Sequence, residues 1–362
     1  MSSFSKWNPL IGGFFLGLFA ILLQFYGIPL NISEGFKNLG DLNFYNVYIF
    51  IILGILSGAF ISSCFYQDFG IKIPPKFEII KAILAGILMG IGSSLALGDN
   101  IGGFYTATAN LSASGISMFA GLILGTLIGL KYLLWEAEKF PSKGGINIYI
   151  KKLSPIVGII VFVIIFGKII TLFLSGKGEN LILGKVFLFS AITGFILQRN
   201  KLCMAKAFRE PFISGETLMT KSFILSLFIT MTGIFFLKFL KIQNPFFYIL
   251  PTFMLGSFIG GILFGLGMTL ADSCALSTLW KLGEGQIKFF VVIIFWGLSN
   301  SISRYYLDKV YKVWEKGYLG KAIFIPDYLT YPGSFILIIG ILLLCFLFVE
   351  WNKRTKKLII KI

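Results

Sequence analysis

A thiol and two hydroxyls follow a long apolar run in the second half of the chain. The run Gly260–Ala271 contains several glycines, and Cys274 follows it. Ser277 and Thr278 lie within the next helical turn. Thiol and hydroxyl groups can both donate hydrogen bonds, so this set could surround one ligand. The alternative is that Cys274 is a small buried packing residue, because free cysteine behaves as a modest hydrophobe.

The same glycine spacing occurs earlier in the chain. Glycines at 86, 90 and 92 match those at 261, 265 and 267 with a constant offset of 175 residues, so Asp99 corresponds to Cys274. Asp99 is the acidic residue of the stretch 98–115, which otherwise contains mainly small and hydroxyl-bearing residues. Asn100 follows it directly. Two roles remain open for Asp99: it could cap a half-helix beginning near Ile101, or it could bind a proton or a cation.

A second thiol, Cys203, stands among cations after another apolar run. Arg199, Lys201 and Lys206 surround it in the sequence, and such cations would attract an anion. The competing interpretation is that these charges only mark the cytoplasmic flank of a membrane span. Cys64 and Cys345 lie inside apolar runs and are predicted to be packing residues.

Several classes of chemistry are excluded by what the chain lacks. It has four cysteines and no histidine, which argues against a disulfide framework, haem or a catalytic zinc. We therefore predict no metal and no cofactor. The sequence contains no visible pair of nucleophile and base, so enzyme catalysis is not expected.

Composition places the chain in a membrane. Of its 362 residues 56% are hydrophobic and 13% are charged, and its mean hydropathy is +0.87. The formal charge of +16 comes largely from lysines in short loops and in the tail at 353–357. This is the positive-inside pattern, so we predict contact with membrane lipid, no binding of nucleic acid and a cytoplasmic C-terminus.

Apolar segments of membrane-spanning length recur along the whole chain. They predict an all-α polytopic membrane protein with about nine or ten transmembrane helices. A basic stretch at 304–321 fits the positive-inside rule only if one segment does not cross, which leaves the exact number open. The predicted segments are 9–28, 46–66, 80–97, 116–135, 154–174, 182–198, 219–240, 247–271, 287–303 and 332–350.

Polar stretches interrupt two of these segments, at 98–115 and 272–286. Irregular backbone survives at membrane depth only where protein or a wet cavity satisfies its amides, so both stretches predict broken or re-entrant helices. Within one transmembrane domain covering 1–362, four spans in 9–135 match four in 182–303. The single span 154–174 links them and 332–350 follows. An odd linking span predicts two inverted repeats, with a site near the midplane where the broken helices meet.

Three blocks resemble motifs of the YeeE/YedE family of membrane proteins, which is linked to thiosulfate uptake and to selenium metabolism. They are the block from Gly194 through Cys203 to Glu210, the helix from Gly261 to Cys274 with Lys281–Gly285, and Leu95–Gly103 with Ser112–Gly115. The resemblance implies that cysteines pass thiosulfate inward from the periplasm by S–H hydrogen bonds. It assigns such a role to Cys274 and Cys203. The chain departs from the family pattern at Asp99, where a cysteine is usual.

The sequence thus predicts a bacterial inner-membrane transporter of a small inorganic sulfur ion, thiosulfate first. Two alternatives stay open. One is transport of a selenium compound or another small solute, with Asp99 as a proton or cation site. The other is a membrane sulfur relay that hands persulfide sulfur from Cys203 to a small cytoplasmic sulfur-carrier protein. The predicted path is lined by Cys274, Cys203, Asp99, Asn100, Ser277 and Thr278.

Overall fold

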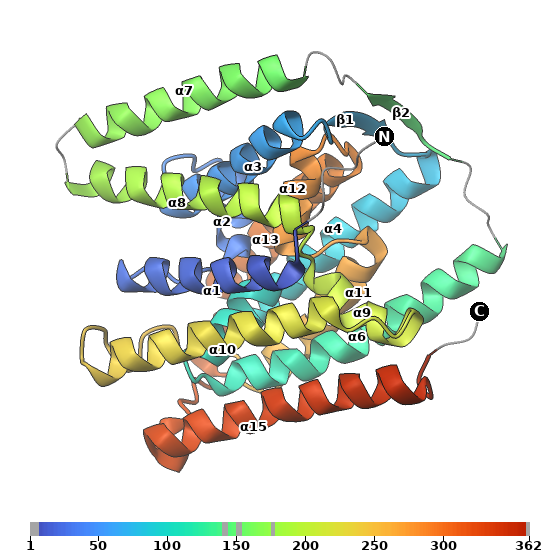
Figure 1. Ribbon diagram of the computed structural model, residues 1–362. Coiled ribbons are helices and arrows are strands. Elements are labelled where there is room, and N and C mark those ends of the chain that lie inside the picture. The colour runs from blue at the N-terminus through green and yellow to red at the C-terminus, as the bar shows by residue number, and fades with distance from the viewer. Residues whose placement is uncertain (1–6, 140–143, 150–153, 175–177, 360–362) are drawn as a thin grey trace.

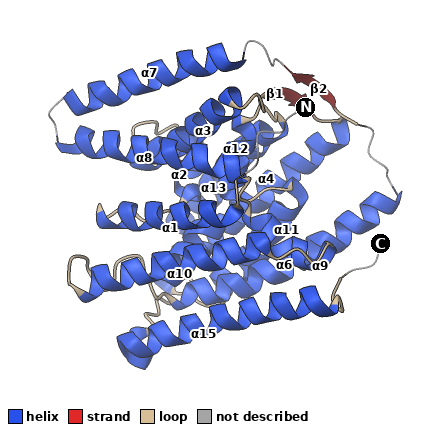
Figure 2. Cartoon of the chain, in the orientation of Figure 1, coloured by secondary structure: helices blue, strands red, loops and turns tan. Residues whose placement is uncertain are grey.

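The protein is an all-α bundle in which the long helices lie side by side along one common direction (Figures 1 and 2). A computed structural model describes residues 7–139, 144–149, 154–174 and 178–359. Two short strands, β1 (Gly70–Ile73) and β2 (Ile146–Tyr149), pair antiparallel. The first half contains helices α1 (Pro9–Phe25), α2 (Ile32–Gly40), α3 (Val47–Phe65), α4 (Lys76–Ala96), the π-helix η1 (Asn100–Thr106), α5 (Ala107–Ala109), α6 (Ala113–Lys139) and α7 (Ser154–Leu174).

The second half continues the same pattern of long and short helices. It contains α8 (Gly178–Asn200), α9 (Met204–Ile213), α10 (Leu218–Phe239), α11 (Leu255–Ala271), α12 (Ala275–Gly283), α13 (Lys288–Tyr305), the π-helix η2 (Tyr306–Val310), α14 (Val313–Lys316) and α15 (Pro326–Thr355).

Eight helical segments of the described chain are long and apolar enough to cross a membrane. Three of them join two helices across a break: Lys76–Ala109, Gly178–Ile213 and Leu255–Gly283. α1 is a shorter apolar helix of 17 residues. Each of the ten segments predicted from the sequence contains a helix, and the chain is a multi-pass membrane protein.

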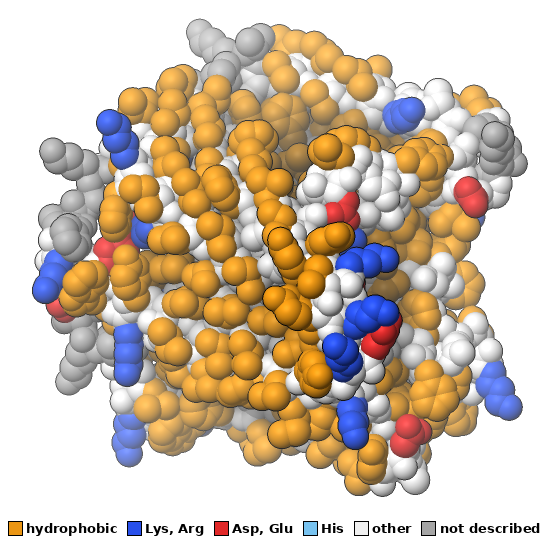
Figure 3. Space-filling view, turned by 180° about the vertical axis from the view of Figure 1, so that it is seen from behind, with side chains coloured by type: hydrophobic (Ala, Val, Ile, Leu, Met, Phe, Trp, Pro, Cys, Tyr) orange, Lys and Arg blue, Asp and Glu red, His pale blue; other side chains and the backbone are white. Residues whose placement is uncertain are grey.

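The surface agrees with this assignment. In Figure 3 hydrophobic side chains cover most of the face, whereas Lys and Arg side chains gather towards its left and right parts. A surface of this kind matches the apolar interior of a bilayer with charged groups near its two interfaces.

Two predicted boundaries were wrong, and both errors concern backbone conformation. The segment 247–271 was expected to be one helix, but α11 begins at Leu255. Pro245 and Pro251 precede it, and Tyr248 and Met254 have positive φ, so an α-helix cannot extend through these residues. No segment is predicted between 198 and 219, but the helix α9 lies there.

Glycines set the contact between α11 and its two neighbours. A Cβ atom at Gly121 of α6 would lie 2.2 Å from the carbonyl oxygen of Phe258, and one at Gly125 would lie 2.1 Å from that of Ile262. On the opposite side of α11, a Cβ at Gly260 would lie 2.6 Å from the carbonyl oxygen of Gly92 in α4. The spacing Gly121-x-x-x-Gly125 therefore allows α6 to pack closely against α11.

The packing pattern of the two halves is reciprocal. α1 packs against α10 and α3 packs against α8, while α4 and α11 pack against each other. Likewise, α11 contacts α6 and α4 contacts α13. When the two halves are exchanged, the α1–α10 contact corresponds to the α3–α8 contact, and the α6–α11 contact corresponds to the α4–α13 contact. The α4–α11 contact corresponds to itself. We infer that 9–135 and 182–303 are inverted repeats joined by α7, with the α4–α11 contact at the centre and α15 added after the second repeat.

The glycine contact makes a prediction about stability. Gly125→Ala should lower the midpoint of thermal unfolding, because overpacking of this kind costs about 1–3 kcal/mol and outweighs the gain in helix propensity. Gly340→Ala in α15 is the matched control, since no atom lies within 4 Å of a Cβ built there. Thermal unfolding in detergent measures both variants, and equal midpoints would contradict the predicted steric contact.

Candidate functional site

Both central helices break at the same position of the repeat. Leu97 is the C-cap residue of α4 and Asp272 that of α11, and both residues adopt the left-handed conformation with φ of 57°. A new helical segment begins within three residues in each half: η1 has Asp99 as its N-cap, and α12 has Cys274. The predicted breaks are confirmed, and both side chains singled out in the sequence lie at helix starts.

Cys274 and Cys203 are brought together by one serine hydroxyl. Ser277 Oγ lies 3.2 Å from Cys274 Sγ and 3.1 Å from Cys203 Sγ. All three residues are fully buried, and both thiols are free. Cys203 is itself the N-cap residue of α9, so the starts of α9 and α12 present their thiols to the same oxygen.

Thr278 and Ser273 complete the hydroxyl cluster around the start of α12. Thr278 Oγ1 donates to the carbonyl oxygen of Cys274 at 2.9 Å and lies 3.1 Å from Ser273 Oγ. Ser273 Oγ is in turn 2.8 Å from Ser277 Oγ. The two predicted hydroxyls therefore belong to one connected network with the Cys274 backbone.

Asn100 joins the first half of the chain to this network. Its side-chain oxygen accepts a hydrogen bond from the backbone N–H of Ala275 at 3.2 Å, and its amide nitrogen lies 3.0 Å from Met204 Sδ. The backbone N–H of Met204 in turn points to Cys274 Sγ at 3.3 Å. Asn100 thus contacts the first residue of α9 and the first residue of α12.

Asp99 occupies a different environment from Cys274, its counterpart in the sequence pattern. Its Oδ1 accepts a hydrogen bond from the backbone N–H of Gly102 at 2.6 Å, which confirms the predicted capping role. The carboxyl group is fully buried, and Oδ2 has no hydrogen-bond partner within the described chain. An unpaired carboxylate oxygen at this depth is costly unless it acquires a proton or a cation.

Asn31, which the sequence does not single out, lies beside η1. Asn31 accepts from Ser33 Oγ at 2.7 Å and donates to Tyr248 Oη at 2.9 Å. It lies next to Gly102, since a Cβ atom there would be 2.4 Å from Asn31 Oδ1.

Two of the three cations beside Cys203 in the sequence pair with acidic residues of other elements. Arg199 pairs with Asp68 at 3.1 Å, and Lys201 pairs with Glu284. These charges tie α8 to the ends of α3 and α12, which supports their interpretation as flank charges. At the break between α11 and α12, Arg209 and Lys281 both pair with Asp272.

The remaining cysteines are separate from the central cluster. Cys64 is buried in α3 and Cys345 lies on α15. Within the residues that the structure describes, no group of three or more Cys, Asp, Glu or His side chains could hold a metal ion.

The arrangement of caps, thiols and broken helices can be set beside known proteins. Residues 2–128 and 199–361 match the family model described as sulphur transport. The chain belongs to this family. It is the YeeE/YedE family whose motifs the sequence resembles, and the match includes both helix breaks, Cys203 and Cys274.

This chain is similar to two groups of relatives, which match shares of it that differ in length. The "Probable transporter YedE" of Escherichia coli (strain K12) is 26% identical over 326 residues, which is 84% of this chain and 76% of that protein. The "Thiosulfate transporter TsuA" of Spirochaeta thermophila is 32% identical over 108 residues, or 29% of this chain and 32% of that protein. The Escherichia coli TsuA is 30% identical over 120 residues, which cover 32% of each chain.

The capping geometry of Asp99 makes a prediction about stability. Asp99→Ala removes the acceptor for the Gly102 N–H and should lower the free energy of unfolding by about 1 kcal/mol. Asp99→Asn keeps a side-chain oxygen at the cap and removes the unpaired acid, so it should be at least as stable as the native chain. Equilibrium unfolding in mild detergent compares the two, and an alanine variant as stable as the asparagine variant would contradict the capping role.

Proposed function

We propose that this protein carries a small sulfur-containing anion, thiosulfate first, across the bacterial inner membrane. The proposed path follows the broken helices through the centre of the molecule. Its residues are Asp99, Asn100, Cys203, Cys274, Ser277 and Thr278.

The observation that carries the proposal is the convergence of two buried thiols on Ser277. Each thiol stands at the start of a separate helix, where backbone N–H groups and the helix dipole favour negative charge. Thiol and hydroxyl protons add donors that can turn towards a bound anion. Sulfur is polarisable and less strongly hydrated than oxygen, so this donor set suits the terminal sulfur of thiosulfate.

Membership of the sulphur transport family supports movement of a sulfur anion rather than catalysis. The names of these relatives support the same class, and two of them name thiosulfate. Those two matches cover about a third of the chain, so the donor chemistry of the thiol pair is needed to extend the substrate to this protein.

The route requires no covalent step. In the structure the thiols and Ser277 satisfy one another, and all are shielded from solvent. An arriving anion would replace the Ser277 oxygen as the partner of each thiol, and release would restore the original contacts. Access would require the contacts of Met204 with Asn100 and Cys274 to open, because they lie directly against the thiol pair.

Uptake measurements test the thiol role. Cys274→Ala should reduce uptake of labelled thiosulfate at least tenfold in cells that lack other uptake routes, since one donor of the pair is lost. Cys64→Ala is the matched control, because Cys64 is an equally buried cysteine in α3 away from the cluster. Membrane levels of both variants are measured by immunoblotting. Unchanged uptake by Cys274→Ala would remove the thiol from the mechanism.

A second candidate function is transport of a selenium compound or another small solute together with a proton or cation at Asp99. The unpartnered Oδ2 favours it, because a buried carboxyl with no basic partner is a natural site for such an ion. Glu34 and Tyr248 face the same region and carry no positive charge, so neither can neutralise Asp99.

The pH dependence of uptake tests the Asp99 site. An anion passes an uncharged acid more readily than a carboxylate, so uptake should rise as the external pH falls. Asp99→Asn should transport at a rate that no longer varies with pH, because its side chain stays neutral and keeps the cap. A native pH profile in this variant would exclude Asp99 as the titrating group.

The sulfur relay receives less support from the geometry. A soluble carrier protein would have to reach Cys203, but that side chain is fully buried against Ser277 in this conformation. We therefore place transport ahead of transfer of persulfide sulfur.

A further inference from the structure

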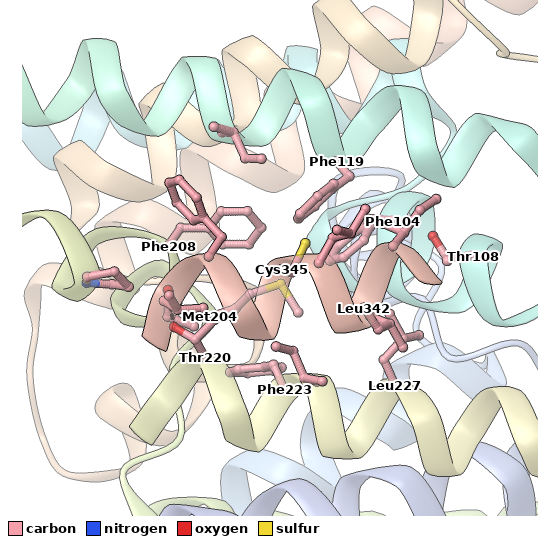
Figure 4. Close-up of a pocket in the computed structure, with 18 of the residues that line it drawn as sticks. Phe104, Thr108, Phe119, Met204, Phe208, Thr220, Phe223, Leu227, Leu342 and Cys345 are labelled. Carbon is pink, nitrogen blue, oxygen red and sulfur yellow. Dashed lines mark hydrogen bonds between the residues drawn. The ribbon is translucent and has the colours of Figure 1, made fainter. Parts of the chain in front are cut away.

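A large cavity lies between α15 and the rest of the bundle. Its volume is about 720 Å³, and Figure 4 shows side chains of several helices pointing into it. Phe223 and Leu227 come from α10, Phe119 from α6, and Leu342 and Cys345 from α15. The lining is almost wholly apolar, so the cavity cannot solvate an inorganic anion.

The position of the cavity matches one leaflet of a membrane. α15 packs mainly against α10 and α9, so it covers the space beside α6 without filling it. The residues of α15 that line the cavity run from Ile338 to Val349, which is about 16 Å along the helix axis. That length is about half the thickness of the hydrocarbon core of a bilayer. A chain of CH₂ groups from one leaflet therefore fits the cavity in both length and polarity.

One end of the cavity is marked by positive charge. Leu358, just after α15, lines the cavity, and its backbone N–H binds Asn352 Oδ1 at 3.0 Å. Asn352 in turn donates to the carbonyl oxygen of Pro211 in α9 at 2.8 Å, which holds the tail at the cavity mouth. Exposed cations precede and follow this turn: Lys353, Arg354, Lys356 and Lys357.

We propose that this cavity binds an anionic phospholipid. One acyl chain lies between α15, α10 and α6, and the phosphate headgroup lies against the basic tail. The apolar lining selects the chain, and the cluster of cations selects the negative headgroup over a zwitterionic one. Each buried CH₂ group contributes to binding in the same way as it does for a membrane-anchored acyl chain.

The lipid site shares one wall with the thiol cluster. Met204 lines the cavity, and its backbone N–H also contacts Cys274 Sγ at 3.3 Å. Tyr105 of η1 lines it too, and its hydroxyl binds Ser226 and Thr230 of α10 at 2.6 and 2.5 Å. An acyl chain in this place supports α9 and η1 from behind, so the lipid stabilises the two segments that bring Met204 and Asn100 to the cluster.

The test uses the full-length protein in detergent with two added lipids that share the same acyl chains. Phosphatidylglycerol should raise the midpoint of thermal unfolding by about 3 °C or more above the value with phosphatidylcholine. Native mass spectrometry should show phosphatidylglycerol retained in preference. Equal shifts and equal retention of the two lipids would overturn the proposed headgroup selection.

Two variants locate the binding. Cys345→Trp fills the cavity and should abolish the difference between the lipids, whereas Leu347→Trp places the same ring on a face of α15 outside the cavity and should retain it. If Cys345→Trp does not fold, the double variant Lys356→Gln and Lys357→Gln answers the same question. It should lose preferential retention of phosphatidylglycerol, and removal of Lys241 and Lys309 elsewhere should not. Retention unchanged by the tail variant would overturn the proposed site.

Discussion

Backbone amides at two helix breaks must find partners inside the protein, because the interior of a bilayer offers none. The rest of the centre depends on this constraint. Asp99 supplies the oxygen that caps η1, and Ser277 exchanges hydrogen bonds with Cys274 at the start of α12. The same groups that satisfy the backbone are the ones proposed to meet the transported ion. Stability and transport therefore draw on one set of hydrogen bonds.

The glycine contacts allow these breaks to face one another. α11 approaches α4 on one side and α6 on the other so closely that a methyl group at Gly92 or Gly125 would meet backbone atoms. Close approach brings η1 within reach of α9 and α12, where Asn100 binds across the two halves. Close packing at these glycines, several helical turns away from the thiols, thus brings the polar residues of the centre together.

The sequence was sufficient to predict the class of fold and the position of both breaks. Long apolar runs predict spans, and the offset that relates Asp99 to Cys274 predicts two equivalent breaks. It could not reveal the short helix α9, whose basic residues resemble a cytoplasmic flank. It also could not show that Arg199 and Lys201 turn away to Asp68 and Glu284. Those partners are distant in the chain, and only tertiary packing brings them together. Asn31 was missed because its neighbours Gly102 and Tyr248 are distant from it in the chain.

Ser277 has one proton and several neighbours that could receive it. Its oxygen lies within 3.3 Å of two sulfur atoms, the hydroxyl of Ser273 and the carbonyl oxygen of Cys274. A hydroxyl donates one hydrogen bond at a time, so these arrangements compete. The protons of this cluster can therefore be arranged in several ways, and this freedom leaves orientational entropy in the cluster. A bound anion that accepts hydrogen bonds would select one of these arrangements, so the protein would need little reorganisation to bind it.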